Sequence, residues 1–345
     1  MNLGTSDGPS AERPTMADVG RQASVSITTV SLVLSGQHSR ISEATKARVL
    51  KAVEDLNYRP NKAAQGLRLG QTRTIGFVTD EILTQPFSGN IAAGLSAVAW
   101  EQQSLLLTVN ATMNTGRLRA AVEDLIDRQV EALVFAAMGS REVDFPETPP
   151  NLPVLLINAY DRRGRIPSIM PNEEEGGRSA IEHALDLGHE RFVFLAGREN
   201  AWATKMRVRG YRDGLEIGGL RPVDNPIFYG DYRIGSGYDL AVRAMQRRPR
   251  PTTLLCGNDQ MAIGAYIALA RMGVRIPEQV SIVGYDDEPI AADLSPSLTT
   301  VRIPFYEMGR VAATHALAGT VSEIGQMLMS CPIVPRASTN RPLGQ

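Results

Sequence analysis

Residues 15–34 read TMADVGRQASVSITTVSLVL and carry two short apolar stripes at helical spacing. The stripes consist of Val19 and Ala23, then of Val30, Val33 and Leu34. Between them, Ser24-Val25-Ser26 is too short for a strand and suits a tight turn. Two short helices joined by such a turn form a helix-turn-helix, whose second helix can lie in the major groove of DNA. An ordinary helical hairpin is the alternative interpretation.

Capping residues support both helices. Thr15 can cap the first, with Asp18 three residues on, and Ser26 can cap a second helix that starts at Ile27. The outward side chains of the second helix suit a groove rather than a core: Ile27, Thr28, Thr29, Ser31 and Leu32. Leu32 cannot make the bidentate guanine contact of an arginine, so it would touch a thymine methyl or pack against a third helix.

Charge is distributed unevenly along the chain. Residues 13–73 hold ten Lys or Arg and four Asp or Glu, whereas residues 74–345 hold 26 and 31. An overall pI near 6.5 therefore hides a basic N-terminal segment. A local positive field attracts a phosphate backbone and makes binding salt-dependent. A solvated charged face is the alternative, but the scarcity of acids favours nucleic acid.

A third helix and a short following segment complete this region. Ser42 can cap the helix, and Asn57-Tyr58-Arg59-Pro60 ends it, because proline disfavours helix in the preceding residue. Residues 61–70 are too short to form a stable isolated helix, which fits a helix that forms only on DNA or else a plain linker. The third helix is expected to bury a broad apolar face of Ala44, Ala47, Val49, Leu50, Val53 and Leu56.

Residues 74–345 alternate apolar strands with amphipathic helices and are too many for one compact core. This alternation predicts an α/β fold: two doubly wound lobes of parallel sheet with a ligand cleft at the carboxyl ends of the strands. Strands are expected at 74–79, 105–109, 132–136, 153–158, 191–196, 226–228, 253–256 and 280–285. Helices are expected near 88–102, 117–129, 175–187, 205–218, 234–247 and 259–272.

Several classes of protein are disfavoured. Residues 1–12 lack the basic start and apolar core of a signal peptide, and no run approaches 18 apolar residues, so a cytoplasmic protein is expected. Cys256 and Cys331 are predicted to be buried free thiols. The four histidines lack metal-ligand spacing, and neither a Walker loop nor a complete dinucleotide fingerprint occurs. We therefore expect no enzyme activity, metal or cofactor.

Two acidic clusters have non-catalytic interpretations. Asp286-Asp287-Glu288 follows an apolar strand, where general acids and bases can lie. Without a nucleophile or a metal set, it suits hydrogen bonding to a polyol better. Glu173-Glu174-Glu175 is most simply a helix N-terminus, where the helix dipole favours acids.

Polar and aromatic residues near strand ends form a candidate ligand site. Carboxylates and amides can hold hydroxyl groups, arginine supplies a fixed fork of donors, and aromatic rings stack on C–H faces. The set therefore suits a sugar-like ligand, although each residue alone could have a structural role. The candidates are Asp80, Phe87, Asn158, Arg207, Tyr232, Asn258, Asp286 and Phe305.

The chain resembles the lactose-repressor/galactose-repressor family of bacterial transcription regulators over nearly its whole length. The motifs are specific only in combination. In the N-terminal region they are Asp18-Val19, Ala23, Val25-Ser26, Thr29-Val30-Ser31, Leu56 to Asn61, and Leu67. Later motifs are Arg207-Val-Arg-Gly-Tyr211, Gly230-Asp-Tyr232, Asn258-Asp259-Gln260 and Gly284-Tyr-Asp286-Asp287.

The resemblance implies specific contacts. In the family, the equivalents of Asn158, Arg207, Tyr232, Asn258, Asp286 and Phe305 line the effector pocket. Asn158 stands where the family often has Asp, and Pro171-Asn172-Glu173 replaces a frequent Asp-Asn pair, which puts any particular sugar in doubt. We expect DNA contacts from Thr15, Ser26, Ile27, Thr28, Thr29, Ser31, Leu32, Asn61, Ala64, Leu67 and Arg68.

The predicted domains follow. We expect a disordered N-terminus over 1–12, a helix-turn-helix DNA-binding domain over 13–60, a hinge helix and linker over 61–73, and an effector-binding and dimerisation domain over 74–345. The resemblance implies three crossings between lobes. Lobe 1 would then comprise about 74–171 and 304–331, and lobe 2 about 172–303 and 332–345.

The expected function is that of a ligand-responsive, homodimeric repressor of carbohydrate uptake or catabolism genes that binds a near-palindromic operator. A sugar or sugar derivative between the lobes would change the spacing of the two hinges and so couple to DNA affinity, by induction or by corepression. No leucine heptads follow the last expected strand, which favours a dimer over a tetramer. The alternative is a cytosolic sugar-binding sensor or sugar-acting enzyme with an accessory basic head.

Overall fold

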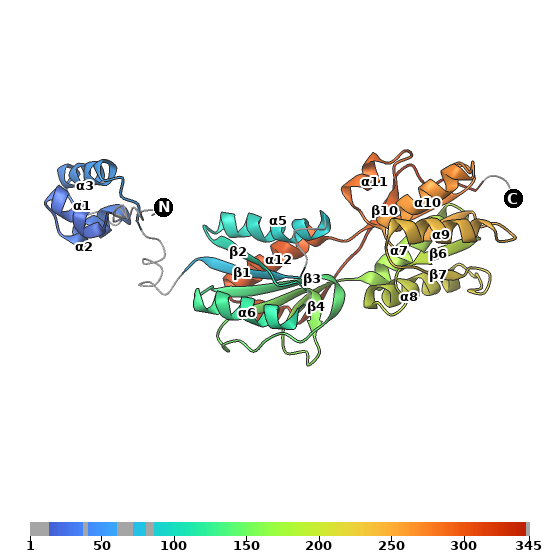
Figure 1. The fold of residues 1–345 in the computed structure, drawn as a ribbon, viewed down its shortest axis with the longest axis horizontal. Helices are drawn as coiled ribbons and strands as arrows, with labels where there is room; N and C mark the ends of the chain where they lie inside the picture. The colour runs from blue at the N-terminus through green and yellow to red at the C-terminus, as the bar shows by residue number, and fades with distance from the viewer. Residues whose placement is uncertain (1–13, 37–40, 61–71, 81–85, 113, 343–345) are drawn as a thin grey trace, which may run out of the picture. The chain divides into compact units, whose positions relative to one another are not determined.

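The computed structural model describes residues 14–36, 41–60, 72–80, 86–112 and 114–342. The chain divides into two compact units, Met1–Thr72 and Arg73–Gln345 (Figure 1). We call the described part of the first unit the head and that of the second unit the body. The expected disorder over 1–12 and the expected DNA contacts of Asn61, Ala64, Leu67 and Arg68 lie outside the described residues.

The head consists of three helices, α1 (Met16–Ala23), α2 (Ile27–Leu34) and α3 (Glu43–Asp55). Thr15 and Asp18 form a reciprocal capping box at the start of α1, and Ser26 caps α2 by accepting from the Thr29 amide at 3.1 Å. Helix α1 ends at Ser24, whose left-handed backbone turns the chain toward α2. The two helices and the turn that the sequence predicts are confirmed.

The core of the head is a single apolar cluster formed by Val19, Ala23, Val30, Val33, Val49, Ala52 and Tyr58. The predicted face of α3 is too broad, because Ala44 and Ala47 are exposed and Leu50 is 54% exposed. At 100° per residue these three positions point away from the buried Val49 and Ala52. A helix packed against its neighbours on one side buries one stripe only.

Lobe 1 of the body contains a six-stranded sheet in the order β11-β5-β4-β3-β1-β2. Alternate residues of β3 face opposite sides: Ala132 and Val134 pack with α5 and α12, whereas Leu133 and Phe135 pack with α6. The strands are β1 (Thr74–Thr79), β2 (Leu105–Asn110), β3 (Ala132–Val143), β4 (Val154–Asp161), β5 (Ser168–Pro171) and β11 (Gln326–Met329). The helices are α5 (Pro86–Glu101), α6 (Thr115–Asp127) and α12 (Phe305–Ala318), and a 3-10 turn η1 (Val321–Glu323) follows α12.

Lobe 2 repeats this plan with a six-stranded sheet in the order β12-β10-β9-β8-β6-β7. Its strand pairs are parallel except that β12 runs antiparallel to β10. Helices α7 and α8 pack together on one face, and α9 and α10 pack on the other. The strands are β6 (Phe192–Ala196), β7 (Ile227–Tyr229), β8 (Thr253–Cys256), β9 (Ser281–Asp286), β10 (Thr299–Arg302) and β12 (Ile333–Val334). The helices are α7 (Glu173–Asp186), α8 (Trp202–Ile217), α9 (Ile234–Met245), α10 (Asp259–Arg271) and α11 (Pro289–Asp293).

The chain therefore changes sheet three times, after β5, after β10 and between β11 and β12. The predicted fold class, an all-α head before a two-lobed, doubly wound α/β body, is confirmed. Cys256 and Cys331 are buried and free, as predicted. Across the described ranges, no helix is both long and apolar enough to cross a membrane.

Some elements differ from the sequence expectations. Strands β5, β10 and β11 and helix α11 were not predicted, because runs of four or five residues are too short to show a period. In the tail that was expected to join lobe 2 over 332–345, the strand is limited to Ile333–Val334, since Pro332 and Pro335 on either side have no N–H to donate. Strand β3 continues to Val143 through polar residues that conceal it in the sequence.

Candidate functional site

The outer surface of the helix-turn-helix carries the candidate DNA contacts. Thr15, Ser26, Ile27 and Thr28 are exposed, and Ile27 keeps 53% of its surface accessible. Thr29, Ser31 and Leu32 are half-buried. Thr15 caps α1, and the other positions cover the amino-terminal half and one side of α2, which is the part of a recognition helix that enters a major groove.

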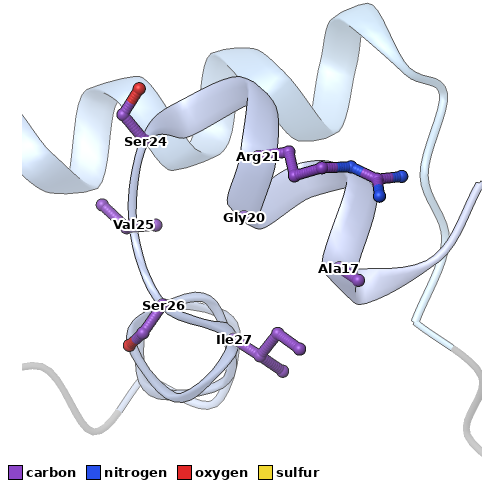
Figure 2. A pocket seen from close by; sticks show the side chains of 7 residues that line it. All are labelled: Ala17, Gly20, Arg21, Ser24, Val25, Ser26 and Ile27. Carbon is purple, nitrogen blue, oxygen red and sulfur yellow. The ribbon is translucent and has the colours of Figure 1, made fainter.

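An open hollow lies between α1 and the start of α2 (Figure 2). Gly20 lines the hollow and lets the turn pack closely against α1, because a Cβ there would lie 3.0 Å from the Val25 carbonyl oxygen. Arg21 projects beside this hollow and pairs with Asp18. The hollow is lined by Ala17, Gly20, Arg21, Ser24, Val25, Ser26 and Ile27.

Thr15 and Ser26 already have local bonding roles in the head. The Thr15 hydroxyl donates to Asp18 at 2.6 Å, and the Ser26 and Thr29 hydroxyls are 2.9 Å apart. Both residues stand at helix N-termini, where amide groups and the helix dipole favour a phosphate. We expect them to position the backbone of DNA rather than to read its bases.

Leu32 is half-buried at the edge of the head core. The partly buried apolar side chains packed against that core are Met16, Val25, Leu34, Ile41, Val53 and Leu56, and Leu32 is not one of them. The base contact of Leu32 stays a prediction.

In the body, the candidate ligand residues come from both lobes. Asp80 follows β1, Tyr232 follows β7, and Asn258 and Asp286 lie at or just after the ends of β8 and β9. Asn158 lies within β4 rather than at its end, because that strand continues to Asp161. Phe305 begins α12, is 4% exposed and packs in the apolar core. The side chain of Phe87 lies outside what the structure describes.

Arg207 occupies the centre of the lobe 2 side. Its Nε and Nη2 donate to the two carboxylate oxygens of Glu173 at 2.7 and 3.0 Å, and its Nη1 donates to the Gly257 carbonyl at 2.5 Å. Asp286 lies nearby, with 3.8 Å between its Oδ1 and the same Nη2. The guanidinium also stacks on the Tyr285 ring, 3.6 Å from its centroid.

Electrostatics follow from this burial. Burial raises the pKa of Asp286 well above its usual range; Arg207 opposes that shift, and the neighbouring carboxylates add to it. Burial alone would lower the pKa of Arg207, but the charge of Glu173 raises it well above its usual value. The centre is thus a permanent cation bound to one carboxylate and close to a second that resists ionisation.

Tyr232 and Asn258 lie beside this centre. The Tyr232 hydroxyl is 2.5 Å from the Thr204 hydroxyl, and Asn258 Nδ2 donates to the Tyr232 carbonyl at 3.1 Å. Asn258 also caps α10 by accepting from the Met261 amide at 2.9 Å. A Cβ on Gly197 would overlap the Tyr232 ring, so only glycine lets that ring lie where it does.

The two lobe 1 candidates, Asp80 and Asn158, form hydrogen bonds with residues of strand β3. Asp80 accepts from the Met138 amide at 2.9 Å and from Arg141 Nη2 at 2.7 Å. Asn158 accepts from Ser140 at 2.5 Å and donates to the Ala137 carbonyl at 3.1 Å. These bonds give both residues the structural role that the sequence left as an alternative, and they place Arg141 at the same edge.

Backbone conformation sets three candidates apart. Their φ values are positive, a backbone conformation that residues other than glycine rarely adopt: 54° for Asn158, 71° for Tyr232 and 111° for Asp286. Each such residue costs on the order of 1–3 kcal/mol and persists only where the surroundings hold it. Such residues cluster at functional sites, so the strain supports a role for this edge of the two sheets.

The sequence interpretation missed part of the site. Glu173 does begin α7, as predicted, but it is buried against Arg207 rather than solvated at the helix end. Tyr160 of β4 and Trp202 of α8 also went unnoticed; their ring centroids are 6.3 Å apart, which joins the two lobes beside the candidate residues. The departure from the family pattern at Pro171-Asn172-Glu173 was the available signal for Glu173.

Comparison with known proteins agrees with this architecture. Residues 15–61 match the family described as bacterial regulatory proteins, lacI family, and residues 181–339 match the periplasmic binding protein-like domain. The ribose operon repressor of Escherichia coli (strain K12) is 31% identical over 302 residues, which is 86% of this chain and 90% of that protein. The chain belongs to the lacI family of bacterial regulatory proteins.

Other similar proteins are also transcription regulators or repressors. Catabolite control protein A of Priestia megaterium is 29% identical over 300 residues, 86% of this chain and 90% of that protein. The crystal structure of the lac repressor dimer bound to operator and the anti-inducer ONPF superposes with a TM-score of 0.80 at 27% identity, over 95% of this chain and all of that one. This lacI-family chain is accordingly a DNA-binding transcription regulator and not an enzyme.

Glu173 falls outside both segments that match the lacI family and the binding-protein domain. Arg207, Tyr232, Asn258 and Asp286 fall inside the second segment. The partner of the central arginine in this lacI-family chain therefore lies outside the segments that the two family models match.

Proposed function

We propose that this regulator represses genes of carbohydrate uptake or catabolism, binds a near-palindromic operator as a homodimer, and responds to a sugar-like effector between its lobes. The observation that carries the effector part is the convergence of Arg207, Asp286, Tyr232 and Asn258 on one edge of lobe 2. Donors, acceptors and aromatic faces at a topological switch point suit a polyhydroxyl ligand.

The names of relatives support the DNA and effector parts. The ribose operon repressor names a sugar operon, and a second lac repressor structure, bound to ONPG in the repressed state, superposes with a TM-score of 0.82 at 28% identity over 95% of this chain and all of that one. By this analogy the head reads an operator half-site with Ile27, Thr28, Thr29, Ser31 and Leu32, while Thr15 and Ser26 hold phosphates. Asn61, Ala64, Leu67 and Arg68 complete the proposed DNA contacts.

The domain limits are part of the proposal. We assign DNA binding to 13–60, the hinge to 61–73, and effector binding and dimerisation to 74–345. The division of the chain between Thr72 and Arg73 supports the last boundary. The proposed place of action is the cytoplasm, on the DNA of the nucleoid.

An exposed apolar surface on lobe 1 supports the homodimer. Strand β2 ends the order of its sheet and packs beside α5 (Figure 1). Leu105, Leu107 and Trp100 are 67%, 37% and 82% exposed there. An apolar edge strand is a liability unless it is covered, and a second copy of this chain would cover it. Leu105→Asp should convert the dimer to a monomer in sedimentation experiments and weaken operator binding; an unchanged dimer would contradict this surface.

Two experiments test the proposed function. Selection of bound sites from random DNA should return a near-palindromic consensus, since a two-fold dimer requires a two-fold site. Anisotropy of that labelled operator, titrated with a panel of sugars, should then show which one changes DNA affinity. A failure to recover any two-fold site would contradict the repressor proposal, and insensitivity of operator binding to every sugar would contradict its effector part.

A further inference from the structure

Glu173 engages most of the hydrogen-bonding capacity of Arg207. A guanidinium has five N–H donors. The two bonds to Glu173 and the bond to the Gly257 carbonyl use three of them, which leaves one N–H on Nη1 and one on Nη2. Glu173 therefore occupies the donor pair on Nε and Nη2 and neutralises the guanidinium, so a carboxylate or phosphate would meet only the two remaining Nη N–H groups and no net positive charge.

The pair is rigid and dry. The side chains of Arg207 and Glu173 are 6% and 2% exposed. Helices α7 and α8 approach so closely that a Cβ on Gly177 would lie 2.3 Å from the Arg207 carbonyl oxygen. Separating the two side chains to accommodate an anion would leave a buried carboxylate without its counterion, which is strongly unfavourable.

The charged groups around Arg207 also disfavour an anionic ligand. Asp286 Oδ1 also lies 3.8 Å from Arg207 Nη2, so one cation faces two carboxyl groups. On the lobe 1 side, Arg141 is already paired with Asp80, at 2.7 Å. A hydroxyl group can accept one of the remaining Arg207 N–H bonds and donate to Asp286, whereas an anionic group would lose its hydration beside a guanidinium whose charge Glu173 already neutralises.

Resting on the proposed function, we propose that Glu173 determines the charge specificity of the effector site and that the effector is an uncharged polyol or sugar. Sugar phosphates and sugar acids are excluded because the arginine that would bind them is held by Glu173. A variant without this carboxylate should accept them.

The test compares matched ligands on the full-length chain. The probes are glucose against glucuronate and glucose 6-phosphate, galactose against galacturonate, and ribose against ribose 5-phosphate, measured by thermal shift and then by calorimetry. In the parent chain, the neutral sugar that binds should do so at least about tenfold more tightly than its anionic partners. In Glu173→Gln this ratio should fall by about tenfold or reverse.

Glu174→Gln is the matched control, because Glu174 is the next residue, its side chain is 35% exposed, and it pairs with Arg209 instead, at 3.2 Å. It should keep the parent ratio. Should Glu173→Gln fail to fold, the parent comparison still decides the matter. An anionic sugar that binds the parent more tightly than its neutral partner would overturn the inference, as would a folded Glu173→Gln with an unchanged ratio.

Operator binding separates this inference from the proposed function. A chain that binds a palindromic operator and responds to an anionic sugar keeps the repressor proposal and loses the charge specificity. A chain that binds no two-fold site loses the repressor proposal, whatever sugar its body prefers.

Discussion

The head and the body of this regulator position their candidate residues by different means. In the head, Ser26 and Thr29 bond to each other three positions apart in the chain, and the reading surface follows from the helical period. In the body, Arg207 bonds to Glu173 and Gly257, which are 34 and 50 positions away. A site made by local contacts should tolerate single substitutions. A site made by long-range ion pairs should lose stability when any one of the paired residues is replaced.

The largest expected effect is on the buried pair of the body. Arg207→Ala should destabilise the body by about 3–5 kcal/mol, because it leaves the buried carboxylate of Glu173 without a partner. Loss of the charge-assisted bonds should also weaken effector binding by about 10- to 100-fold. Urea unfolding followed by tryptophan fluorescence measures the body, since the two tryptophans, Trp100 and Trp202, both lie there.

Two variants control this prediction. Arg209→Ala removes the exposed pair with Glu174 and should cost less than about 1 kcal/mol. The double variant Arg207→Ala/Glu173→Ala should recover part of the lost stability. If Arg207→Ala alone were as stable as the parent chain, the ion pair would not organise this site.

The second prediction is that Asp18 in the head and Asp259 in the body contribute to stability with opposite dependence on pH. Burial raises the pKa of Asp259 from 3.8 to about 7, so the stability it contributes is complete below pH 4 and is lost as the pH rises through 7. The bonds from Thr15 lower the pKa of Asp18, so its contribution is present above pH 4 and is lost as the pH falls. Tryptophan fluorescence should report the first trend, and helical circular dichroism of an isolated segment 13–60 the second.

Asp259→Asn sharpens this comparison. It should flatten the pH dependence of body stability between pH 4 and 7, even though it also disturbs the bonds of Asp259 to Thr300 and to the Glu288 amide. An unaltered slope in that variant would show that Asp259 does not titrate with folding.

The third prediction concerns base reading by the head. Leu32 offers only apolar contact, so the half-site should favour thymine where an arginine would favour guanine. Leu32→Arg should shift preference at that one position toward guanine by about 1–3 kcal/mol and leave effector binding in the body unchanged. Sites selected from random DNA by parent and variant provide the measurement. Identical consensus half-sites would show that Leu32 does not contact bases.

The smallest expected effect is loss of a helix cap. Ser26→Ala removes the acceptor for the Thr29 amide and should destabilise the head by about 1 kcal/mol. Ser26→Asn, which keeps a capping acceptor, should be near the parent chain. A loss confined to the alanine variant, and absent from the fluorescence transition of the body, would confirm that the head's site is local.

Much of the architecture could be predicted from the sequence because it depends on local patterns. The caps at Thr15, Ser26 and Ser42 were identified correctly, as was the β-α alternation over the body. The errors concern what a pattern is packed against. Leu50 satisfies the helical period of α3 but faces solvent, and Leu105 belongs to an apolar strand that the fold leaves at the edge of a sheet.

The candidate ligand residues show the same limit. Arg207 and Asp286 were identified from sequence, and the structure places Arg207 Nη2 3.8 Å from Asp286 Oδ1, beside the ion pair of Arg207 with Glu173. Glu173 was interpreted from its neighbours along the chain, and nothing local reveals that α8 places an arginine against it. Sequence alone determined the helix-turn-helix, the basic segment and the doubly wound class, because caps, charge and hydrophobic period act within a few residues. Only the tertiary structure decided which carboxylate neutralises Arg207, because that depends on two helices held at close approach by glycines distant in the chain.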